Sequence, residues 1–578
     1  MNQQEIFRAN DWSAEAFDTA LGELSDQKHV WAQLPVEERI ALLRATKDSL
    51  LAVADDWVET AARGKQIPVG SPLEGEEWLS GPYAVMCGLN ALIDTLSQLD
   101  GKAYLERVKT RSLATGQLAV RVLPVSFKDE LALPDVKAEA WMRPGVTADN
   151  LPQHAARAYN VPLSDRNGCI ALVLGAGNIS AIAPLDVLHK LILEHQVVIL
   201  KMNPISADLT DCLKSALSPL VDRGFLRIVC GDAEAGAYLC DHALVDEIHV
   251  TGSAATHAAI VWGVGPEAEQ ARAAGQPRME KRITSELGGI SPTIVVPGPW
   301  SEADIKYQAE HIASQKLHNS GHNCIACQAL ILPKSWDKSS QLMDAVREVV
   351  RAHSRPAYYP GSLDRMAAFA ANAQDVVHVE RPNGAPPLMI GKLGNGAWQM
   401  SQECFAPALG TKELDDPDAE TYLRSAIAYA NDKLSGTLGA NILIHPRTLA
   451  DLGQQRFEEM IAELRYGTIA VNTWCGLAFN APTCPWGAFP GHTLEDIQSG
   501  IGTVHNALML ENIERVVIQA PWRPFPRSIL SGEMTAFPRP PYFITHKTQH
   551  KLGPLLTRFQ HSPSLLKLPR ILIGAVLG

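Results

Sequence analysis

The stretch between Asn167 and Thr251 constrains the fold most, because it alternates apolar runs with helix-like segments. The first run, residues 170–174, has no polar side chain, as expected for a strand buried on both faces of a parallel sheet. A helical segment and another apolar run follow, and this unit is then repeated. Strands and helices in such alternation predict a doubly wound α/β domain. We expect its strands at residues 170–174, 197–201, 226–230 and 247–251.

A carboxylate and a thiol flank the strand and helix expected next. Glu286 begins the segment Glu-Leu-Gly-Gly, and Cys324 ends the segment Asn-Ser-Gly-His-Asn-Cys. Between them lie an apolar run at residues 293–296 and a segment with helical spacing at 304–313, so the chain can bring the two side chains face to face. A cysteine that attacks a carbonyl and a glutamate that later activates water suit a covalent mechanism.

These motifs and their order resemble those of the aldehyde dehydrogenase superfamily over roughly residues 30–510. The family's general base heads a Glu-Leu-Gly-Gly segment, and its nucleophile stands three residues after a glycine, here Gly321. The resemblance therefore implies Glu286 as the base and Cys324 as the nucleophile. One departure is His322, where the family usually has Gln. Cys324 and Cys327 form a Cys-x-x-Cys pair, which could instead be a redox pair or half of a zinc site. A zinc site needs a second pair of ligands, and because the other cysteines are scattered, no metal is predicted.

The resemblance also assigns residues to the coenzyme, which is NAD or NADP. Lys201 resembles the lysine that contacts the adenosine ribose, and Gly252-Ser253 resembles the glycine-serine loop that holds the pyrophosphate. Glu403 and Phe405 stand in a segment whose glutamate binds the nicotinamide ribose and whose phenylalanine packs beside the nicotinamide. Many NAD-preferring members have a glutamate where this chain has Pro204, so the sequence leaves NAD and NADP both open.

Asn178 follows the first predicted strand at a tight turn. By resemblance its amide supports the oxygen that becomes negative when the thiol attacks, although an asparagine that merely forms the turn is the alternative. Trp474 and Phe479 suggest an apolar substrate, and core packing explains aromatic residues as well. The predicted function is NAD(P)-dependent oxidation of an apolar aldehyde to a carboxylic acid through a thiohemiacetal and a thioester. The alternatives are a CoA-acylating dehydrogenase of the same fold, which would not need Glu286, and a non-catalytic binding protein.

The composition of the chain limits the kinds of partner that the protein can bind and the cell compartment in which we expect it. A net charge of −12 argues against a general nucleic-acid binder, because such proteins present a basic face to phosphates. The first residues, Asn2-Gln3-Gln4-Glu5, are polar and lack the apolar segment of a secretory signal, so we do not expect such a signal. Ten scattered cysteines fit a reducing compartment better than a disulfide framework. These observations predict a cytoplasmic enzyme, and the resemblance implies a homodimer or homotetramer.

The predicted domains follow from these segments. Residues 1–102 form a helical part of the cofactor domain, 103–150 a β-hairpin that joins subunits, 151–285 the dinucleotide-binding domain and 286–480 a second, catalytic α/β domain. Residues 481–519 return to the cofactor and oligomerisation region, and 520–578 form a tail. Residues 261–282 are expected to be a surface loop or an extra turn.

The tail differs in composition from the rest of the chain. From Ala520 onward it has eight Lys or Arg residues against one acidic residue, Glu533, and its last residues are rich in leucine and isoleucine. Such a segment either packs on a subunit or domain, or lies on a membrane surface as a peripheral contact.

Overall fold

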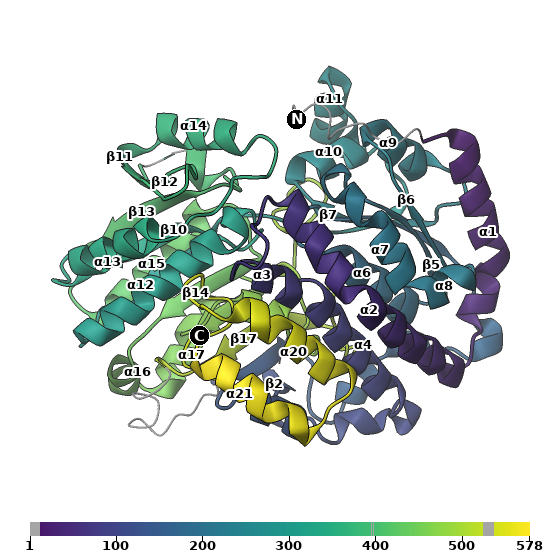
Figure 1. The fold of residues 1–578 in the computed structure, drawn as a ribbon, viewed down its shortest axis with the longest axis horizontal. Helices are drawn as coiled ribbons and strands as arrows, with labels where there is room; N and C mark the ends of the chain where they lie inside the picture. The colour runs from purple at the N-terminus through teal and green to yellow at the C-terminus, as the bar shows by residue number, and fades with distance from the viewer. Residues whose placement is uncertain (1–11, 395, 397, 524–536) are drawn as a thin grey trace.

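The computed structural model describes residues 12–394, 396, 398–523 and 537–578, and these form two β-sheets with helices packed on them (Figure 1). The smaller sheet has six strands and the larger one eleven. Figure 1 shows the smaller sheet among the purple and teal helices at the right and most of the larger sheet at the left. The predicted α/β class is confirmed.

The smaller sheet contains all four strands that the apolar runs predict. Its order is β16-β8-β7-β4-β5-β6, and all pairs are parallel except β16 with β8. The central strand β4 is buried on both faces, which explains its continuous apolar run. The strands are β4 (Ile170–Leu174), β5 (Val197–Lys201), β6 (Leu226–Val229), β7 (Glu247–Gly252), β8 (Arg282–Leu287) and β16 (Gly500–Ile501).

Helices follow the strands of this sheet, and the first helices of the chain cover it. Helix α6 (Ile182–Leu188) follows β4 and continues as a π-helical turn, η5 (His189–Leu193). The others are α1 (Ala14–Ala32), α2 (Val36–Gly64), α3 (Glu74–Leu79), α4 (Pro82–Leu96), η6 (Pro204–Leu209), α7 (Thr210–Ala216), α8 (Ser218–Asp222), α9 (Ala233–Asp241), α10 (Ala254–Trp262) and α11 (Pro266–Ala273).

The larger sheet has the order β1-β2-β3-β17-β15-β14-β9-β10-β13-β12-β11. Its pairs from β17 to β12 are parallel, whereas β1, β2 and β3 extend it as an antiparallel meander. The segment expected to be a separate hairpin is thus continuous with this sheet. The strands are β1 (Thr110–Ser112), β2 (Leu118–Leu123), β3 (Lys137–Met142), β9 (Ser291–Val295), β10 (Cys327–Pro333), β11 (Gln374–Val379), β12 (Leu388–Lys392), β13 (Ala408–Leu414), β14 (Gly439–Leu443), β15 (Thr468–Val471) and β17 (Ile513–Gln519).

The chain passes from the smaller sheet to the larger one just after Glu286. The predicted start of the catalytic segment at 286 falls inside β8, which still pairs with β7 up to Leu287. The helices of this half are α12 (Glu302–Leu317), α13 (Ser339–Arg351), α14 (Ser362–Asn372), α15 (Ala419–Lys433), α16 (Pro446–Leu452), α17 (Gln454–Glu463) and α18 (Gly476–Phe479), with short turns at η7 (His318–Gly321) and η8 (Trp398–Met400).

Two segments differ from what the sequence pattern predicts. Within residues 1–102, predicted only as helical, the chain breaks between α3 and α4, because Gly81 has non-helical dihedrals and Pro82 begins the second helix. The segment at 261–282 is not an irregular loop, since it contains the whole of an exposed helix, α11. Pro266 stands in the first turn of that helix, and alanine and glutamate, which favour helices, follow it.

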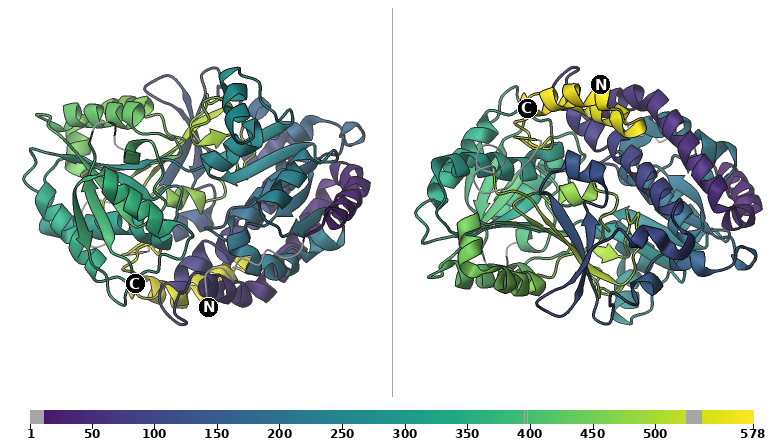
Figure 2. Two further views of the ribbon diagram at one scale, coloured as in Figure 1. Left: turned by 90° about the horizontal axis from the view of Figure 1, so that it is seen from above. Right: turned by 90° about the horizontal axis from the view of Figure 1, so that it is seen from below.

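The described part of the tail packs on its own chain. Helix α20 (Gln549–His561) crosses α3 where Gly75 meets Gln549 and Gly553 meets Trp78, and a Cβ at either glycine would collide with the other helix. Figures 1 and 2 show α20 and α21 (Leu568–Val576), in yellow, beside the N-terminal helices. Among the described residues, no helix is both long and apolar enough to cross a membrane. Residues 524–536, which include Arg527 and Glu533, lie outside the described part.

Candidate active site

Cys324 lies just after a tight turn that links α12 to β10. The turn η7 holds Asn319 and Ser320 at φ angles of 51° and 58°, a left-handed conformation that is costly for residues other than glycine. Gly321 follows with a φ of 79°, and a side chain there would press on the backbone of Ala406. This backbone brings Cys324 to the carboxyl end of β8, where its Sγ donates to Oε1 of Glu286 at 3.3 Å. The predicted thiol and carboxylate are therefore in contact.

The surroundings of the pair favour the protonated form of both groups. Glu286 is 2% exposed, and burial, together with the negative charge of Asp186, raises the pKa of its carboxyl. Burial and the charges of Glu286 and Glu403 raise the pKa of the Cys324 thiol well above its usual value. Cys324 thus lies in a pocket dominated by carboxylates, and Glu286 is the nearest group that can take the thiol proton.

Asn178 is buried beside the same turn. Its Nδ2 donates to the carbonyl of His322 at 3.0 Å, and Nδ2 of Asn319 donates to the carbonyls of Asn178 and His322 at 3.0 and 2.9 Å. The hydroxyl of Tyr358 donates to Oδ1 of Asn319 at 3.0 Å. These bonds fix Asn178 against the residues that precede Cys324, and one of its two amide hydrogens is used in doing so.

His322, which replaces the family's usual glutamine, has an inward-facing side chain. It is fully buried among the rings of Tyr358, Tyr359 and Phe405. Nε2 lies 3.1 Å from Oγ of Ser362. Burial and the cation of Arg365 lower the pKa of this imidazole well below its usual value. His322 is therefore a neutral ring that helps to shape the turn.

The residues assigned to the adenosine and pyrophosphate lie at the carboxyl ends of strands in the smaller sheet. Lys201 ends β5 and is largely buried; burial lowers the pKa of its ammonium, while Asp232 opposes that shift. Gly252 ends β7, and Ser253 is the N-cap of α10, its Oγ accepting from the backbone N–H of Thr256 at 3.1 Å. This edge of a doubly wound sheet is where dinucleotides bind in folds of this kind.

Glu403 and Phe405 reach the site from the larger sheet. The carboxylate of Glu403 lies against the backbone of Gly288, where any side chain would collide with it. Its Oε1 is buried without a hydrogen-bond partner, and burial raises its pKa to about 8 despite Arg365 and Lys316. Phe405 has a φ of 45°, and its carbonyl accepts from Nη2 of Arg365 at 3.2 Å. A buried carboxylate with an unused oxygen suits a ligand that offers hydroxyl donors.

A second polar cluster stands beside Glu286, and the sequence analysis did not find it. Asp186 is fully buried, and its Oδ2 accepts from Oγ1 of Thr251 at 2.9 Å. His249 Nε2 lies 3.6 Å from Oδ2, and His505 Nε2 lies 3.8 Å from Oδ1. Burial raises the pKa of Asp186, but the two histidines outweigh it and the net pKa is lowered. The available signal was one acidic residue within the otherwise apolar α6.

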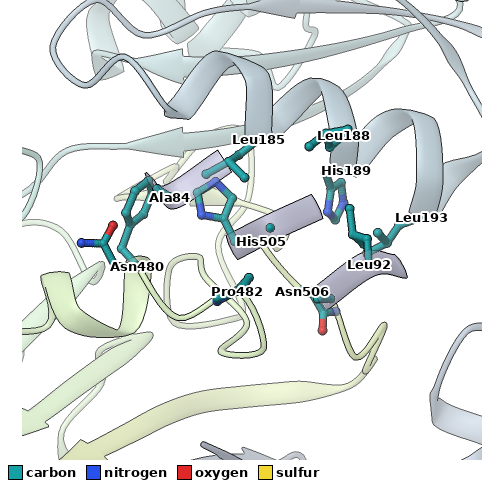
Figure 3. Close-up of a pocket in the computed structure, with 13 residues that line it drawn as sticks. Ala84, Leu92, Leu185, Leu188, His189, Leu193, Asn480, Pro482, His505 and Asn506 are labelled. Carbon is teal, nitrogen blue, oxygen red and sulfur yellow. The ribbon is translucent and has the colours of Figure 1, made fainter. Parts of the chain in front are cut away.

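Two pockets adjoin this cluster. A polar one is lined by Glu286, His249 and Thr284 and reaches Arg282, whose side chain is 60% exposed. A largely apolar one lies between α4, α6 and the residues after α18, and its accessible volume is about 30 Å³. Figure 3 shows Leu185, His505 and Pro482 around this second pocket.

The sequence of the chain was compared with those of known proteins. The model of the aldehyde dehydrogenase family matches residues 196–491, which is more than half of the chain and includes both Glu286 and Cys324. The chain belongs to the aldehyde dehydrogenase family. This membership confirms the resemblance inferred from the motifs, and with it the predicted enzyme class, an oxidoreductase.

Individual relatives agree with the family assignment. The N-succinylglutamate 5-semialdehyde dehydrogenase of Sphingopyxis alaskensis is 26% identical over 462 residues, which span 76% of this chain and 79% of that one. Among solved structures, an aldehyde dehydrogenase of Mycobacterium tuberculosis complexed with NAD+ superposes with a TM-score of 0.55 at 19% identity, over 88% of this chain and 90% of that one. An NADP-dependent glyceraldehyde-3-phosphate dehydrogenase of Bacillus halodurans, complexed with NADP, gives 0.57 at 18% identity, over 88% and 91%. These structures share the fold.

Proposed function

We propose that this member of the family oxidises an apolar aldehyde to a carboxylic acid with NAD or NADP as the oxidant. The observation that carries the proposal is the 3.3 Å contact between Sγ of Cys324 and Oε1 of Glu286 in a buried site. A thiol beside a carboxylate whose pKa is raised by burial is the arrangement that covalent catalysis followed by hydrolysis requires.

The steps assigned to this chain follow from that contact. Glu286 accepts the thiol proton, and Sγ of Cys324 adds to the aldehyde carbon to form a thiohemiacetal. The free amide hydrogen of Asn178 supports the oxyanion. Lys201, Ser253 and Glu403 would hold the coenzyme, which when bound would supply the hydride acceptor needed to convert the thiohemiacetal into a thioester on Cys324. Glu286 releases the thiol proton to solvent and, again a carboxylate, deprotonates a water that attacks the thioester; the thiolate then leaves and takes that proton back from Glu286 as the carboxylic acid is released.

The residues present fit a dinucleotide. Lys201 supplies an ammonium at the end of β5, and Ser253 begins a helix whose first N–H groups can hold a pyrophosphate. Glu403, with one buried oxygen lacking a partner, is suited to a ribose hydroxyl near Gly288. Position 204 is a proline at the start of η6, so no carboxylate there repels a 2′-phosphate. This composition supports both NAD and NADP.

Two features support an apolar substrate. Trp474 is buried next to the nucleophile, with Nε1 donating to the carbonyl of Ile325 at 3.2 Å. The apolar pocket of Figure 3 is lined in part by Phe479 and His505. His505 lies close enough to Glu286 to lower the pKa of its carboxyl. An apolar chain of the aldehyde would be buried in such surroundings. Its burial would stabilise the enzyme–substrate complex by about 25 cal/mol for each Å² of apolar surface removed from water.

The test is a panel of aliphatic and aromatic aldehydes assayed with NAD and with NADP, in the presence and absence of CoA. The proposal expects turnover without CoA and kcat/KM rising with chain length. Turnover that requires CoA would favour the acylating alternative, and no turnover with any aldehyde would favour a binding protein. Light scattering on the same preparation tests the homodimer or homotetramer, and cell fractionation tests the cytoplasmic location.

A further inference from the structure

The outer surface of the C-terminal tail carries an unusual concentration of exposed apolar side chains. Among the described residues, thirteen large hydrophobic side chains are exposed, and six of these lie between Leu565 and Leu577. The other seven are scattered over the chain, as is normal for a soluble protein. The six are Leu565, Leu566, Leu572, Ile573, Val576 and Leu577.

Helical spacing places four of these side chains, Leu572, Ile573, Val576 and Leu577, on the side of α21 that faces away from α20, and Leu565 and Leu566 precede them in the turn η9 (Leu565–Lys567). Ile571 and Ala575, four residues apart in α21, are buried against Leu552 of α20 in a small apolar cluster. Ile573 and Leu577 are also four apart, as are Leu572 and Val576, and each pair therefore lies on a stripe that faces away from α20. The amphipathic pattern of α21 thus has one face docked on the protein and the other in solvent.

The tail is held firmly enough to present this face. Oγ1 of Thr548 donates to the carbonyl of Gly574 at 2.7 Å, and Arg539 donates to the terminal carbonyl of Gly578 at 3.0 Å. Further back, Nε of Arg539 lies 2.8 Å from Oε2 of Glu310 on α12. Ile544 also donates its backbone N–H to Ser314 at 3.0 Å. The exposed leucines and isoleucine therefore belong to a fixed surface.

The charges that the tail itself carries are positive, although Arg558 is paired with Asp55 and Arg539 with Glu310. Residues 537–578 contain six Lys or Arg and no Asp or Glu. Lys547, Lys551 and Arg570 are exposed, and Arg570 lies on the stripe of Ile573 and Leu577, three and seven residues before them. A long arginine side chain at such a place can lie along apolar surface and extend its guanidinium to a phosphate. The protein as a whole has a charge of −12, so the basic tail stands apart from the rest of it.

From these observations we infer that the face formed by Leu565, Leu566, Leu572, Ile573, Val576 and Leu577 docks on the surface of a membrane that contains anionic lipids. The face offers apolar side chains to the acyl boundary and cations to the phosphates, the two contributions that peripheral binding combines. A second copy of this chain fits less well, because a symmetric contact through the face would bring the basic residues of two tails, which have no acidic residue between 537 and 578, into one interface. Because α21 has only nine residues, it is too short to span the bilayer and would lie in the interface between the membrane and water.

The test is co-sedimentation of the full-length protein with two kinds of vesicle, pure phosphatidylcholine and an equal mixture of phosphatidylcholine and phosphatidylglycerol. We expect binding to the mixed vesicles and at least about ten-fold weaker partitioning for the double variant Ile573→Glu and Leu577→Glu, which removes two exposed apolar side chains that membrane binding would bury. Arg570→Gln should weaken binding about five-fold. Raising the salt from about 0.1 M to about 1 M, which shortens the Debye length from about 10 Å to about 3 Å, should also weaken it.

The matched control is the double variant Val264→Glu and Val377→Glu, which makes a similar chemical change at exposed positions, one just before α11 and one in β11, on the opposite side of the molecule from the tail (Figure 1). It should bind vesicles like the wild type, and both double variants should retain the wild-type melting temperature because the altered side chains are exposed. The inference is overturned if the wild type does not bind the mixed vesicles, or if the tail variant binds them equally well. A tail variant that changes the oligomeric state, in a protein that ignores vesicles, would instead assign the face to a second copy.

Discussion

Sγ of Cys324 and Oε1 of Glu286 lie 3.3 Å apart, although 38 residues separate them in the chain. The thiol follows a turn with two non-glycine residues in the left-handed region, and the carboxylate ends a strand of the other sheet. Each residue is thus positioned by a different sheet. The contact can exist only when the two sheets are docked, which ties the chemistry of this enzyme to its tertiary structure.

Cys324→Ala should abolish aldehyde oxidation, with kcat falling by a factor on the order of 10⁴ or more, because no other group can form the thioester. The control is Cys327→Ala. Cys327 is fully buried in β10 and packs in the core of the larger sheet, so its loss should cost about 1 kcal/mol of stability and leave kcat within a few-fold of wild type. Full turnover in the Cys324 variant would exclude covalent catalysis by this residue.

Glu286→Gln should slow steady-state turnover by about 10²–10³-fold, because a glutamine cannot deprotonate the hydrolytic water. Glu286 also accepts the thiol proton, so thioester formation should be slower than in the wild type, but hydride transfer precedes hydrolysis and a burst of reduced coenzyme close to one equivalent per site should remain. Intact mass spectrometry after the burst should show the acyl group on Cys324. A variant that turns over normally, or one that shows no burst and no adduct, would contradict the role given to Glu286.

The charge cluster beside Glu286 predicts shifts of opposite sign in the pH profile. The carboxylate form of Glu286 is the base, so activity should rise with pH through its raised pKa. Asp186 raises that pKa and His505 lowers it. Asp186→Asn should therefore move the acid limb of kcat to lower pH, and His505→Gln should move it to higher pH. Equal profiles for both variants and wild type would show that the cluster serves only to hold the fold.

Position 204 should control the choice of coenzyme. Pro204 begins η6 just after β5, at the same end of the sheet as Lys201. A carboxylate placed here would repel a 2′-phosphate. Pro204→Glu should therefore lower kcat/KM with NADP relative to NAD by about ten-fold or more, while Pro204→Gln, its uncharged counterpart, should change the ratio little. Steady-state kinetics with both coenzymes at a fixed aldehyde concentration give the measurement.

The parts of this structure that sequence reasoning predicts well are those fixed by local patterns. Strands β4 and β5 begin and end where their apolar runs do, because a strand buried on both faces leaves a continuous signal. Glu286 and Cys324 were found because each stands in a motif whose glycines are required by close backbone approaches, as at Gly288 and Gly321.

The parts that were missed depend on contacts between distant elements. Asp186, His249 and His505 come from α6, β7 and a loop near the end of the chain, and no local pattern relates them. The break between α3 and α4 depends on Gly81, whose neighbours in space include Ser180. The left-handed conformation of Asn319 is likewise stabilised from outside, since its backbone N–H donates to Oε2 of Glu76 at 3.0 Å.

That last contact predicts a role for Glu76 in stability. Its carboxylate is buried in an ion pair with Arg355, whose Nη1 lies 2.8 Å from Oε2. Burial raises the pKa of Glu76, but the interactions of its carboxyl with Arg355 and His318 outweigh burial and the net pKa is lowered. Glu76→Gln leaves the Arg355 cation buried without a partner, so the free energy of unfolding should fall by about 3–5 kcal/mol near neutral pH.

The lowered pKa of Glu76 also predicts how the stability difference between the wild type and Glu76→Gln changes with pH. A carboxyl whose pKa is lower in the folded state stabilises the fold above its unfolded pKa, about 4.3, and loses that effect as the pH falls through the folded value. The difference between wild type and Glu76→Gln in urea unfolding should therefore be largest near neutrality and shrink in acid. Glu59→Gln is the control, since Glu59 pairs with Arg63 at 3.9 Å with both side chains mostly exposed, and it should have no measurable effect. A constant difference at all pH values would show that Glu76 acts through packing and not through its charge.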